Sequence, residues 1–319
     1  MQSPLTRLFH DGRFYAFLAA AGASMKAIFV KLAYAAGPVD PVTLLAMRMG
    51  IALPFFIWMA WISGRKSSSA LSGPDLMRIA ALGFVGYYLS SLFDFYGLVH
   101  ITAGLERMIL YLYPTMVLLM QAWLVRRAPD RRAWSAMAIC YAGLAIAFAH
   151  DLQQEQGGNV VVGAAWVFAC AVSYALYYVG TGRLVGRIGS TRLAGLAGSA
   201  SALFVLAHFL LVGEPRALPD LPPDVWLHAG LMALLSTVLP VWWLALAIQR
   251  LGAAQAAGIG TLGPVMTVFA AWLLLGESLS VLQLCGLALV LFGVMRLKPS
   301  QPKAVSAPAP AASAAGRRP

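Results

Sequence analysis

The sequence predicts an all-α integral membrane protein of ten transmembrane helices, arranged as two inverted five-helix repeats with both termini in the cytoplasm. Three observations predict this fold class. Hydrophobic residues make up 60% of the 319 residues and charged residues only 11%, with a mean hydropathy of +0.76, which is far from the composition of soluble globular proteins. Apolar runs long enough to cross a bilayer recur from end to end. The two halves of the chain also share a spacing of residues.

The apolar runs are expected to be helices, because hydrocarbon offers no water to satisfy the backbone groups of an irregular chain. Five of them would form a first repeat over residues 13–149, after a cytoplasmic segment over residues 1–12. These five runs cover residues 14–36, 42–62, 76–99, 103–125 and 133–149. No cleavable signal is recognised before the first run, so this helix is expected to stay in place as a signal anchor.

The other five runs would form a second repeat over residues 160–297. They cover residues 160–181, 193–212, 225–248, 252–276 and 279–295. Residues 298–319, rich in alanine, proline and serine, cannot build a core. This segment is therefore expected to be a disordered cytoplasmic tail.

The net charge of +11 is interpreted as a signal of membrane topology. Loops on one expected side of the membrane hold almost all of the loop lysines and arginines. The opposite loops hold a single basic residue, Arg216, and most of the acidic ones, which are Asp40, Asp151, Glu155, Glu214, Asp220, Asp224 and Glu277. The positive-inside rule then places both termini in the cytoplasm of a multi-pass protein of the inner (plasma) membrane. Nucleic acid is not expected as a partner.

An offset of 150 positions relates the two halves. It aligns Pro114 with Pro264 and Gly143 with Gly293, and further pairs follow the same offset, such as Ala103 with Ala253 and Met116 with Met266. Each half carries an odd number of helices, so the second half would enter the membrane from the opposite side. Inverted repeats of this kind are typical of alternating-access carriers.

The second half resembles the EamA repeat of the drug/metabolite transporter superfamily in Gly263-Pro264-Val265-Met266-Thr267, Gly276-Glu277, Gln283, Gly286 and Gly293. The first half resembles it in Lys31, Arg48, Ala103, Pro114 and Gly143. One position departs from the pattern, because the first repeat has Arg126-Arg127 where the second has Gly276-Glu277. The resemblance implies two EamA repeats of five helices and movement of small metabolites, commonly outward.

Cations within the spans are candidates for a functional site, since a charge in the bilayer core costs about 2.5–3.5 kcal/mol on insertion scales. Lys26 lies near the middle of its span and is the favoured candidate for a central cavity, whereas Lys31 points elsewhere. Arg48 is expected to pair with Asp94 or Glu106, either beside a substrate or in a structural ion pair. Arg107 is expected to reach the membrane interface.

The acidic candidates are Asp94, expected to be partly solvated, and Glu106, expected to share a helix face with Tyr113. An apolar setting would favour the protonated form of Glu106 and a role in proton coupling. A nearby arginine would favour the ionised form and structural pairing, so both roles remain open. The six charged groups sum to +2, four basic minus two acidic, which favours a substrate carrying a carboxylate or another anion.

The second half offers aromatic candidates, Tyr177, Trp242 and Trp243, which would either contact the apolar part of a substrate or pack between helices. Pro114 and Pro264 interrupt corresponding spans and are hinge candidates, although proline is also common in membrane helices. The cysteines Cys140, Cys170 and Cys285 are interpreted as small core residues.

The sequence therefore predicts a secondary transporter of a small polar or amphipathic metabolite, amino-acid-like or otherwise carboxylate-bearing, with export as the preferred direction. Uptake or exchange of an organic anion is the alternative. An intramembrane enzyme is less favoured because the histidines are scattered and match no ligand spacing, and a channel is less favoured because no ring of charges is seen. No metal or cofactor is expected. The expected partners are the lipid bilayer, a small-molecule substrate and protons as a candidate coupling ion, while the oligomeric state remains open.

Overall fold

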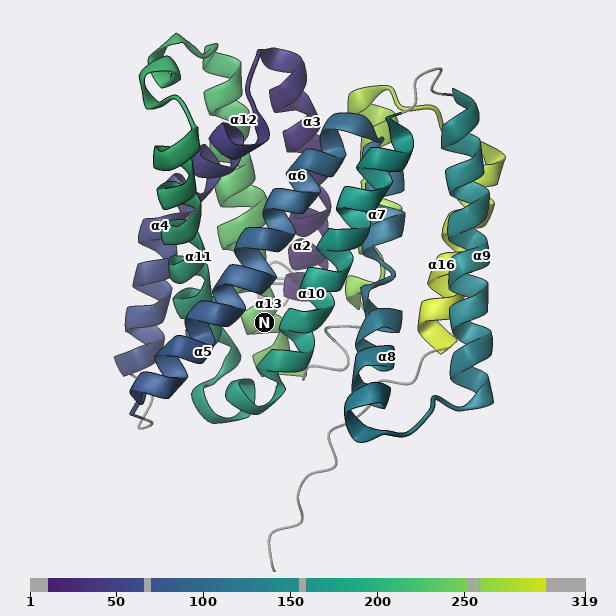
Figure 1. The fold of residues 1–319 in the computed structure, drawn as a ribbon, viewed down its shortest axis with the longest axis horizontal. Coiled ribbons are helices and arrows are strands. Elements are labelled where there is room, and N and C mark those ends of the chain that lie inside the picture. The colour runs from purple at the N-terminus through teal and green to yellow at the C-terminus, as the bar shows by residue number, and fades with distance from the viewer. Residues whose placement is uncertain (1–10, 66–69, 155–158, 252–255, 257–258, 297–319) are drawn as a thin grey trace, which may run out of the picture.

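The computed structural model is an upright bundle of helices (Figure 1), with no strand in the described residues, which are 11–65, 70–154, 159–251, 256 and 259–296. Eight helices are long and apolar enough to cross a membrane. They are Gly12–Ala36, Pro41–Arg65, Gly73–His100, Ala103–Val125, Arg131–Ala149, Val160–Thr181, Ser190–Val212 and Pro223–Ile248. These eight spans correspond to the first eight apolar runs, as predicted.

Two shorter apolar helices, Gly263–Leu275 and Val281–Arg296, take the places of the ninth and tenth runs. Residues 252–255 and 257–258, at the start of the ninth run, lie outside the described residues, so ten crossings stay a prediction. The expected tail over residues 298–319 lies outside them as well, as does most of the expected N-terminal segment over residues 1–12.

The elements that build the first half follow one another with short connections. They are α2 (Gly12–Ser24), α3 (Lys26–Ala36), α4 (Pro41–Arg65), α5 (Gly73–Gly83), η1 (Phe84–Leu89), α6 (Ser90–His100), α7 (Ala103–Leu110), α8 (Tyr113–Val125) and α9 (Arg131–Gln154). The second half consists of α10 (Val160–Ile188), α11 (Ser190–Val212), η2 (Pro215–Asp220), α12 (Pro223–Ala233), η3 (Leu234–Val238), α13 (Leu239–Leu251), α15 (Gly263–Ala270), η4 (Ala271–Leu275) and α16 (Val281–Arg296).

Several spans expected to be continuous are interrupted. The first span turns at Met25, between α2 and α3, and the fourth turns at Tyr111 and Leu112, between α7 and α8. Thr261 and Leu262 form the corresponding turn before α15, 150 residues after the turn in the fourth span. Pro114 and Pro264 lie in the first turns of α8 and α15. Backbone N–H groups in a first turn have no partner within the helix, so a proline there removes no helical hydrogen bond. The two prolines mark the interruptions of the fourth and ninth spans in the sequence, whereas the apolar pattern gives no sign of the break at Met25.

Two π-helical segments also recur at the offset of 150. They are η1, which begins at Phe84, and η3, which begins at Leu234. A π-helical turn widens the backbone ladder and leaves carbonyl groups for side chains to bond. The Ser173 hydroxyl donates to the Val85 carbonyl at 2.6 Å, and the Thr237 hydroxyl donates to the Met232 carbonyl at 3.0 Å. Both π-helical segments are thus stabilised by buried hydroxyl groups.

The two halves interlock, because the most extensive helix contacts join a helix of one half to a helix of the other. The pairs are α9 with α16, α4 with α11, α6 with α10, and α2 with α13. Small residues bring α9 and α16 together: a Cβ on Gly143 would meet the Gly286 carbonyl at 2.6 Å, and one on Gly293 would meet Cys140 Sγ at 2.5 Å. Such small-residue contacts are typical of helix packing within membranes.

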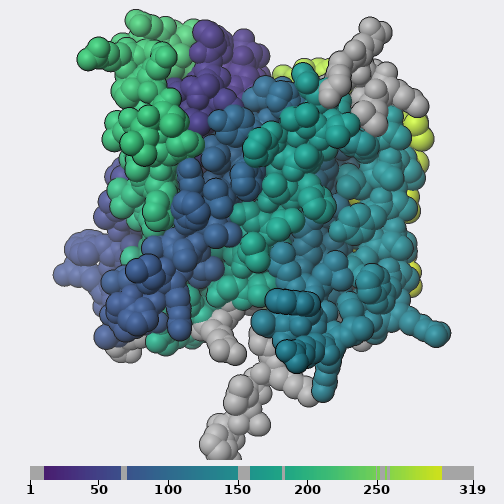
Figure 2. Space-filling model, viewed as in Figure 1, coloured from purple at the N-terminus to yellow at the C-terminus, as the bar shows by residue number. Residues whose placement is uncertain are grey.

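The bundle has two ends, named here after residues that lie at them. The Glu277 end contains the connections α3–α4, α6–α7, α11–α12 and η4–α16, and the Arg127 end contains the connections α8–α9 and α10–α11. The Glu277 end lies at the top of Figure 1. Side chains fill the spaces between the ribbons over most of the face seen in Figure 2. Large apolar side chains such as Trp61, Trp123 and Leu211 are exposed, as expected for a surface that contacts lipid.

Candidate functional site

Three interrupted spans meet in the middle of the bundle. The Ser24 hydroxyl, at the end of α2, donates to the Gly263 carbonyl at 2.9 Å, and the Thr267 hydroxyl donates to the Ser24 carbonyl at 3.1 Å. From α7, Arg107 Nη2 donates to the Ala23 carbonyl at 3.0 Å. The break in the first span is therefore held by the fourth and ninth spans, at the place where their own turns lie. Discontinuous helices of this kind build the central sites of many transporters.

An ionic cluster occupies this meeting point. Lys26, the first residue of α3, lies with its Nζ 2.7 Å from Asp94 Oδ2 and 3.7 Å from Glu106 Oε1. Arg107 Nε lies 3.8 Å from Glu106 Oε2. Both carboxylates are fully buried, while the Lys26 side chain is 16% exposed. The predicted central position of Lys26 agrees with this geometry.

Two expectations about this cluster are wrong. Asp94 is not partly solvated but fully buried, because α6 packs against α3 and places the carboxylate beside Lys26. Arg107 does not reach the membrane interface. Its side chain is 12% exposed and turns inward to Ala23 and Glu106.

Among the described residues, the carboxylate oxygens of the cluster have no donor near them beyond the two cations Lys26 and Arg107. Neither oxygen of Asp94 or Glu106 accepts a well-directed hydrogen bond within the described part of the chain, although Lys26 stands close to both groups. The two carboxyl groups approach the same ammonium group, that of Lys26. An ionised carboxylate only accepts, whereas a protonated one also donates. The arrangement is therefore chemically suited to hold and release a proton.

Arg48 forms a second buried site and does not join the cluster, contrary to the expected pairing with Asp94 or Glu106. Its Nε donates to the Thr237 hydroxyl at 2.9 Å and its Nη1 to the Ser91 hydroxyl at 3.4 Å. Its guanidinium lies 5.6 Å from the centre of the Phe95 ring. No carboxylate lies within 4.0 Å of this arginine among the residues that the structure describes. The cation is 7% exposed, and its partners among the described residues are neutral.

Helix α6 carries groups of both sites. Ser91 and Phe95 contact Arg48, and Asp94 on the neighbouring face contacts Lys26. The third span thus places the uncompensated cation next to the ionic cluster.

Sequence reasoning missed the neutral partners of Arg48, namely Ser91, Phe95 and Thr237. Ser91 and Thr237 are hydroxyl residues inside apolar spans, which is a weak signal because such residues often bond their own helix. Thr237 lies within η3, and Ser91 lies just after η1. The hydrophobic pattern of the sequence does not predict such π-helical segments. The eighth span thus contacts Arg48 through Thr237 in η3, and the third span contacts it through Ser91 and Phe95 in α6, directly after η1.

A tyrosine cluster lies between α8 and α10, formed by Tyr113, Tyr174, Tyr177 and Tyr178. Tyr113 stacks on Tyr178 with ring centres 5.1 Å apart, and Tyr174 stacks on Tyr177 at 6.3 Å. The Tyr177 hydroxyl lies 3.4 Å from that of Tyr87 in η1, a residue that sequence reasoning missed. The predicted face shared by Glu106 and Tyr113 is wrong, since the turn at Tyr111 and Leu112 separates α7 from α8. Tyr113 instead contacts Tyr174 and Tyr178, in the cluster that also contains Tyr177.

Other candidates lie apart from these sites. Trp242 is 46% exposed, and neither Trp242 nor Trp243 has a described contact with Lys26 or Arg48. Cys140 and Cys170 are buried, but Cys285 is exposed, so its interpretation as a core residue is wrong. Pro114 and Pro264 each follow a helix break, while their role as hinges stays a prediction. Among the described residues, no three His, Cys, Asp or Glu side chains are grouped to hold a metal ion.

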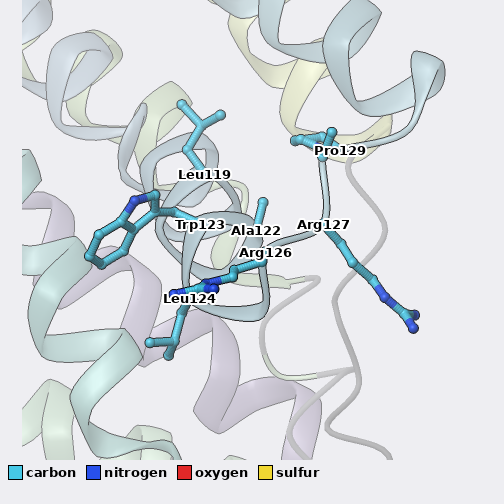
Figure 3. A pocket seen from close by; sticks show the side chains of 8 residues that line it. Leu119, Ala122, Trp123, Leu124, Arg126, Arg127 and Pro129 are labelled. Carbon is cyan, nitrogen blue, oxygen red and sulfur yellow. The ribbon is translucent and has the colours of Figure 1, made fainter.

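Hollows open at both ends of the bundle. At the Glu277 end, a hollow of about 600 Å³ is lined by residues that include Lys31, Tyr34, Leu98 and Glu277. At the Arg127 end, a hollow of about 540 Å³ lies between the end of α8 and the chain that leads to α9. Figure 3 shows Trp123, Arg126 and Arg127 around this second hollow, with the two arginine side chains pointing in different directions. The central charges thus lie between two hollows at opposite ends of the bundle.

Comparison with known proteins places these features in context. The model of the EamA-like transporter family matches residues 11–149 and 161–297. The chain is 30% identical over 271 residues to the "Uncharacterized transporter YcbK" of Bacillus subtilis (strain 168), covering 84% of this chain and 86% of that protein. It is 25% identical over 242 residues to the "Uncharacterized transporter sll1319" of Synechocystis sp. (strain ATCC 27184 / PCC 6803 / Kazusa), covering 74% and 71%.

A solved crystal structure has a similar fold, with a TM-score of 0.61 and 19% identity. The match covers 89% of this chain and 95% of the solved chain. At this identity the likeness concerns the fold alone.

Proposed function

The chain belongs to the EamA-like transporter family of the drug/metabolite transporter superfamily, and from this premise we propose that it moves a small carboxylate-bearing metabolite across the inner (plasma) membrane by alternating access. The two inverted repeats would be residues 13–149 and 160–297, forming ten crossings. The Arg127 end, which carries most of the basic residues, would face the cytoplasm. Export is the preferred direction.

The observation that carries this proposal is the buried Arg48 guanidinium, which has neutral partners only. A cation inside a bilayer is costly without a countercharge, and a substrate carboxylate would supply one. A guanidinium presents donors in a fork that matches a carboxylate. The Ser91 and Thr237 hydroxyls hold the guanidinium in place, and Phe95 covers one side of it.

The ionic cluster supports a role in coupling. Lys26, Asp94, Glu106 and Arg107 sum to zero, two basic and two acidic groups. This balance leaves Arg48 as the buried charge without an ionic partner among the described residues, so it, rather than Lys26, is the proposed anchor for an anion. The donor-poor carboxyls of Asp94 and Glu106 are the proposed carriers of a proton.

The tyrosine cluster, including Tyr113 and Tyr177, is proposed to contact the less polar part of the substrate. Helix α10 extends from the α6 contact toward these rings, so one substrate could reach both groups as the bundle rearranges. Pro114 and Pro264 would act as hinges, because each follows the turn of an interrupted span. The tryptophans Trp242 and Trp243 are not part of this proposal.

The experiment compares metabolites in medium and cells of bacteria that express wild type, Arg48→Ala or Arg78→Ala at matched membrane levels. Arg78 is an exposed arginine of α5 and serves as the control for loss of a positive charge. The proposal expects a carboxylate-bearing compound moved by wild type and Arg78→Ala but not by Arg48→Ala. Movement of a cation, or equal movement by all three proteins, contradicts it. Accumulation inside the cells would favour the alternative, uptake of an organic anion.

A further inference from the structure

Glu277, which the proposed site does not use, joins the ends of the fourth and ninth spans. The Ala103 backbone amide donates to Glu277 Oε1 at 2.7 Å, and the Gly104 amide donates to Glu277 Oε2 at 3.2 Å. These two residues begin α7, so a carboxylate from the loop after η4 caps the N-terminus of a helix in the other repeat. A carboxylate is favoured at this position by free backbone donors and by the helix dipole.

Gly104 makes this approach possible. A Cβ added there would lie 2.8 Å from Gln283 Nε2 and 3.6 Å from Glu277 Oε2. Thr102 caps the same helix through the Leu105 amide at 3.1 Å. The first turn of α7 is therefore held from within its own repeat by Thr102 and from the other repeat by Glu277.

The capped helix is also the one that carries the central acid. Helix α7 has eight residues, with the Glu277 cap at its start, Glu106 and Arg107 in its middle, and the turn at Tyr111 and Leu112 after its end. Glu277 itself borders the hollow at the Glu277 end, together with Leu98. A movement of α7 away from Glu277 would join this hollow to the ionic cluster.

The Arg127 end has the same backbone but a different side chain. Arg126 and Gly276, 150 residues apart, both end their helices in the left-handed conformation, with φ of 54° and 68°. Arg127 occupies the position that corresponds to Glu277. An arginine side chain has no acceptor, so it cannot cap a helix N-terminus, and it is exposed beside the hollow in Figure 3.

We propose that Glu277 is the gating residue of the Glu277 end, which opens only when the carboxylate leaves the N-terminus of α7, and that Arg127, whose side chain has no acceptor for backbone amides, does not act as an equivalent latch at the opposite end. This inference rests on the alternating access proposed above. It makes the two ends unequal, although the repeats are related in sequence. The resting carrier is closed at the Glu277 end.

The test measures how fast a buried cysteine at the Glu277 end reacts with a membrane-impermeant maleimide. Leu98 is fully buried yet borders the hollow, so Leu98→Cys reports opening. Cys285→Ala removes the exposed native thiol, and the protein without Leu98→Cys gives the background from Cys140 and Cys170. Arg216→Cys, at an exposed position in η2, shows which side the reagent reaches and whether the surface reacts normally.

Loss of a charged helix cap changes an equilibrium by about 5- to 30-fold. Glu277→Ala is therefore expected to raise the reaction rate of Leu98→Cys by about this factor. The rate with Glu277→Gln should lie between those with Glu277 and with Glu277→Ala, because the amide keeps one acceptor. The rate at Arg216→Cys should not change. An unchanged rate at Leu98→Cys in both Glu277 variants overturns the proposal.

A second variant does not remove the latch and so remains informative if Glu277→Ala fails to fold. Arg127→Glu supplies the missing carboxylate at the Arg127 end and should favour opening at the Glu277 end, raising the rate at Leu98→Cys. Arg132→Glu makes the same charge change in the first turn of α9, directly after this connection, and is the control. Equal labelling rates at Leu98→Cys with Arg127→Glu and with Arg132→Glu overturn the proposed difference between the two ends of the bundle. Because labelling needs no substrate, failure of the proposed transport activity would be seen separately.

Discussion

The Lys26 ammonium lies 2.7 Å from the Asp94 carboxylate, across the contact between α3 and α6. The cation that compensates the buried acids therefore comes from the break in the first span, and Arg48 is left with neutral partners. The charges of Lys26, Asp94, Glu106 and Arg107 balance, whereas Arg48 has no ionic partner among the described residues. We therefore expect substitutions in the ionic cluster and at Arg48 to have different effects.

Removal of Lys26 should destabilise the protein. Lys26→Met leaves two buried carboxylates without their ammonium, and breaking one partner of a buried pair costs about 3–5 kcal/mol. We expect a clear fall in the midpoint temperature of unfolding in detergent, followed by tryptophan fluorescence. Lys26→Met combined with Asp94→Asn should recover most of the loss. A double variant no more stable than the single one would show that the pair does not contribute as an ionic unit.

Much of the fold could be predicted from the sequence, because helices in a bilayer must be apolar over a fixed length. Eight spans follow the expected runs, and the offset of 150 reappears in the π-helical segments, the turns before Pro114 and Pro264, and the left-handed residues Arg126 and Gly276. The interruptions beside Pro114 and Pro264 were expected from the two prolines, but the break at Met25 and the π-helical segments were not predicted. Neighbouring helices supply hydrogen-bond partners for the backbone groups that a break leaves free. An interrupted span can therefore be as apolar in sequence as a continuous one.

The candidate site was predicted in its residues but not in its pairing. Lys26, Asp94 and Glu106 were identified because charges in apolar spans are rare, and the structure brings them together. The assignment of Arg48 to these acids was wrong, because depth along a helix does not determine which neighbour a side chain faces. Rotation of the third span by η1 turns Ser91 and Phe95, not Asp94, toward Arg48.

Substitution of Arg48 should affect substrate affinity more than folding. Arg48→Gln removes the charge, and a hydrogen bond to a charged group contributes about 1.5–3 kcal/mol. We therefore expect KM for the transported carboxylate to rise about 10- to 100-fold in liposomes. Arg48→Lys should be intermediate because the charge remains without the fork. If KM is unchanged and only the unfolding temperature falls, Arg48 is a structural residue.

Thr237→Val tests the support of the guanidinium from the π-helical segment. The variant removes the hydroxyl that accepts from Arg48 Nε at 2.9 Å and nearly preserves the side-chain volume. A weaker anchor should raise KM by about tenfold, in line with the loss of a buried hydrogen bond to a charged group. Thr43→Val, in the buried first part of α4, is the control for a lost hydroxyl. Equal effects of the two substitutions would contradict a specific role for Thr237.

Glu106→Gln tests proton coupling. The amide retains the shape of the side chain but cannot exchange a proton, so transport should persist as exchange and lose its dependence on a pH gradient. The measurement compares substrate accumulation in liposomes with and without an imposed gradient. Wild type and Arg107→Lys, which keeps the neighbouring charge, provide the reference. Retained gradient dependence in Glu106→Gln would assign Glu106 to structure alone.

The glycine contact between α9 and α16 should be intolerant of larger side chains. A Cβ on Gly143 would lie 2.6 Å from the Gly286 carbonyl, whereas one on Gly230 in α12 has no neighbour within 4 Å. Overpacking of this kind costs about 1–3 kcal/mol. Gly143→Ala should lower the unfolding temperature, and Gly230→Ala should leave it unchanged or raise it slightly. Equal stability of both variants would contradict the close approach of the two repeats.

Counterflow in liposomes tests the central claim, alternating access of a carboxylate-bearing substrate, most directly. The labelled probe is the compound that the comparison of wild type with Arg48→Ala identifies. A carrier predicts saturable entry of the label that accelerates when unlabelled compound is present on the opposite side, and loss of this acceleration in Arg48→Gln. Entry that rises linearly with concentration and ignores the opposite side would contradict alternating access and indicate a passive channel.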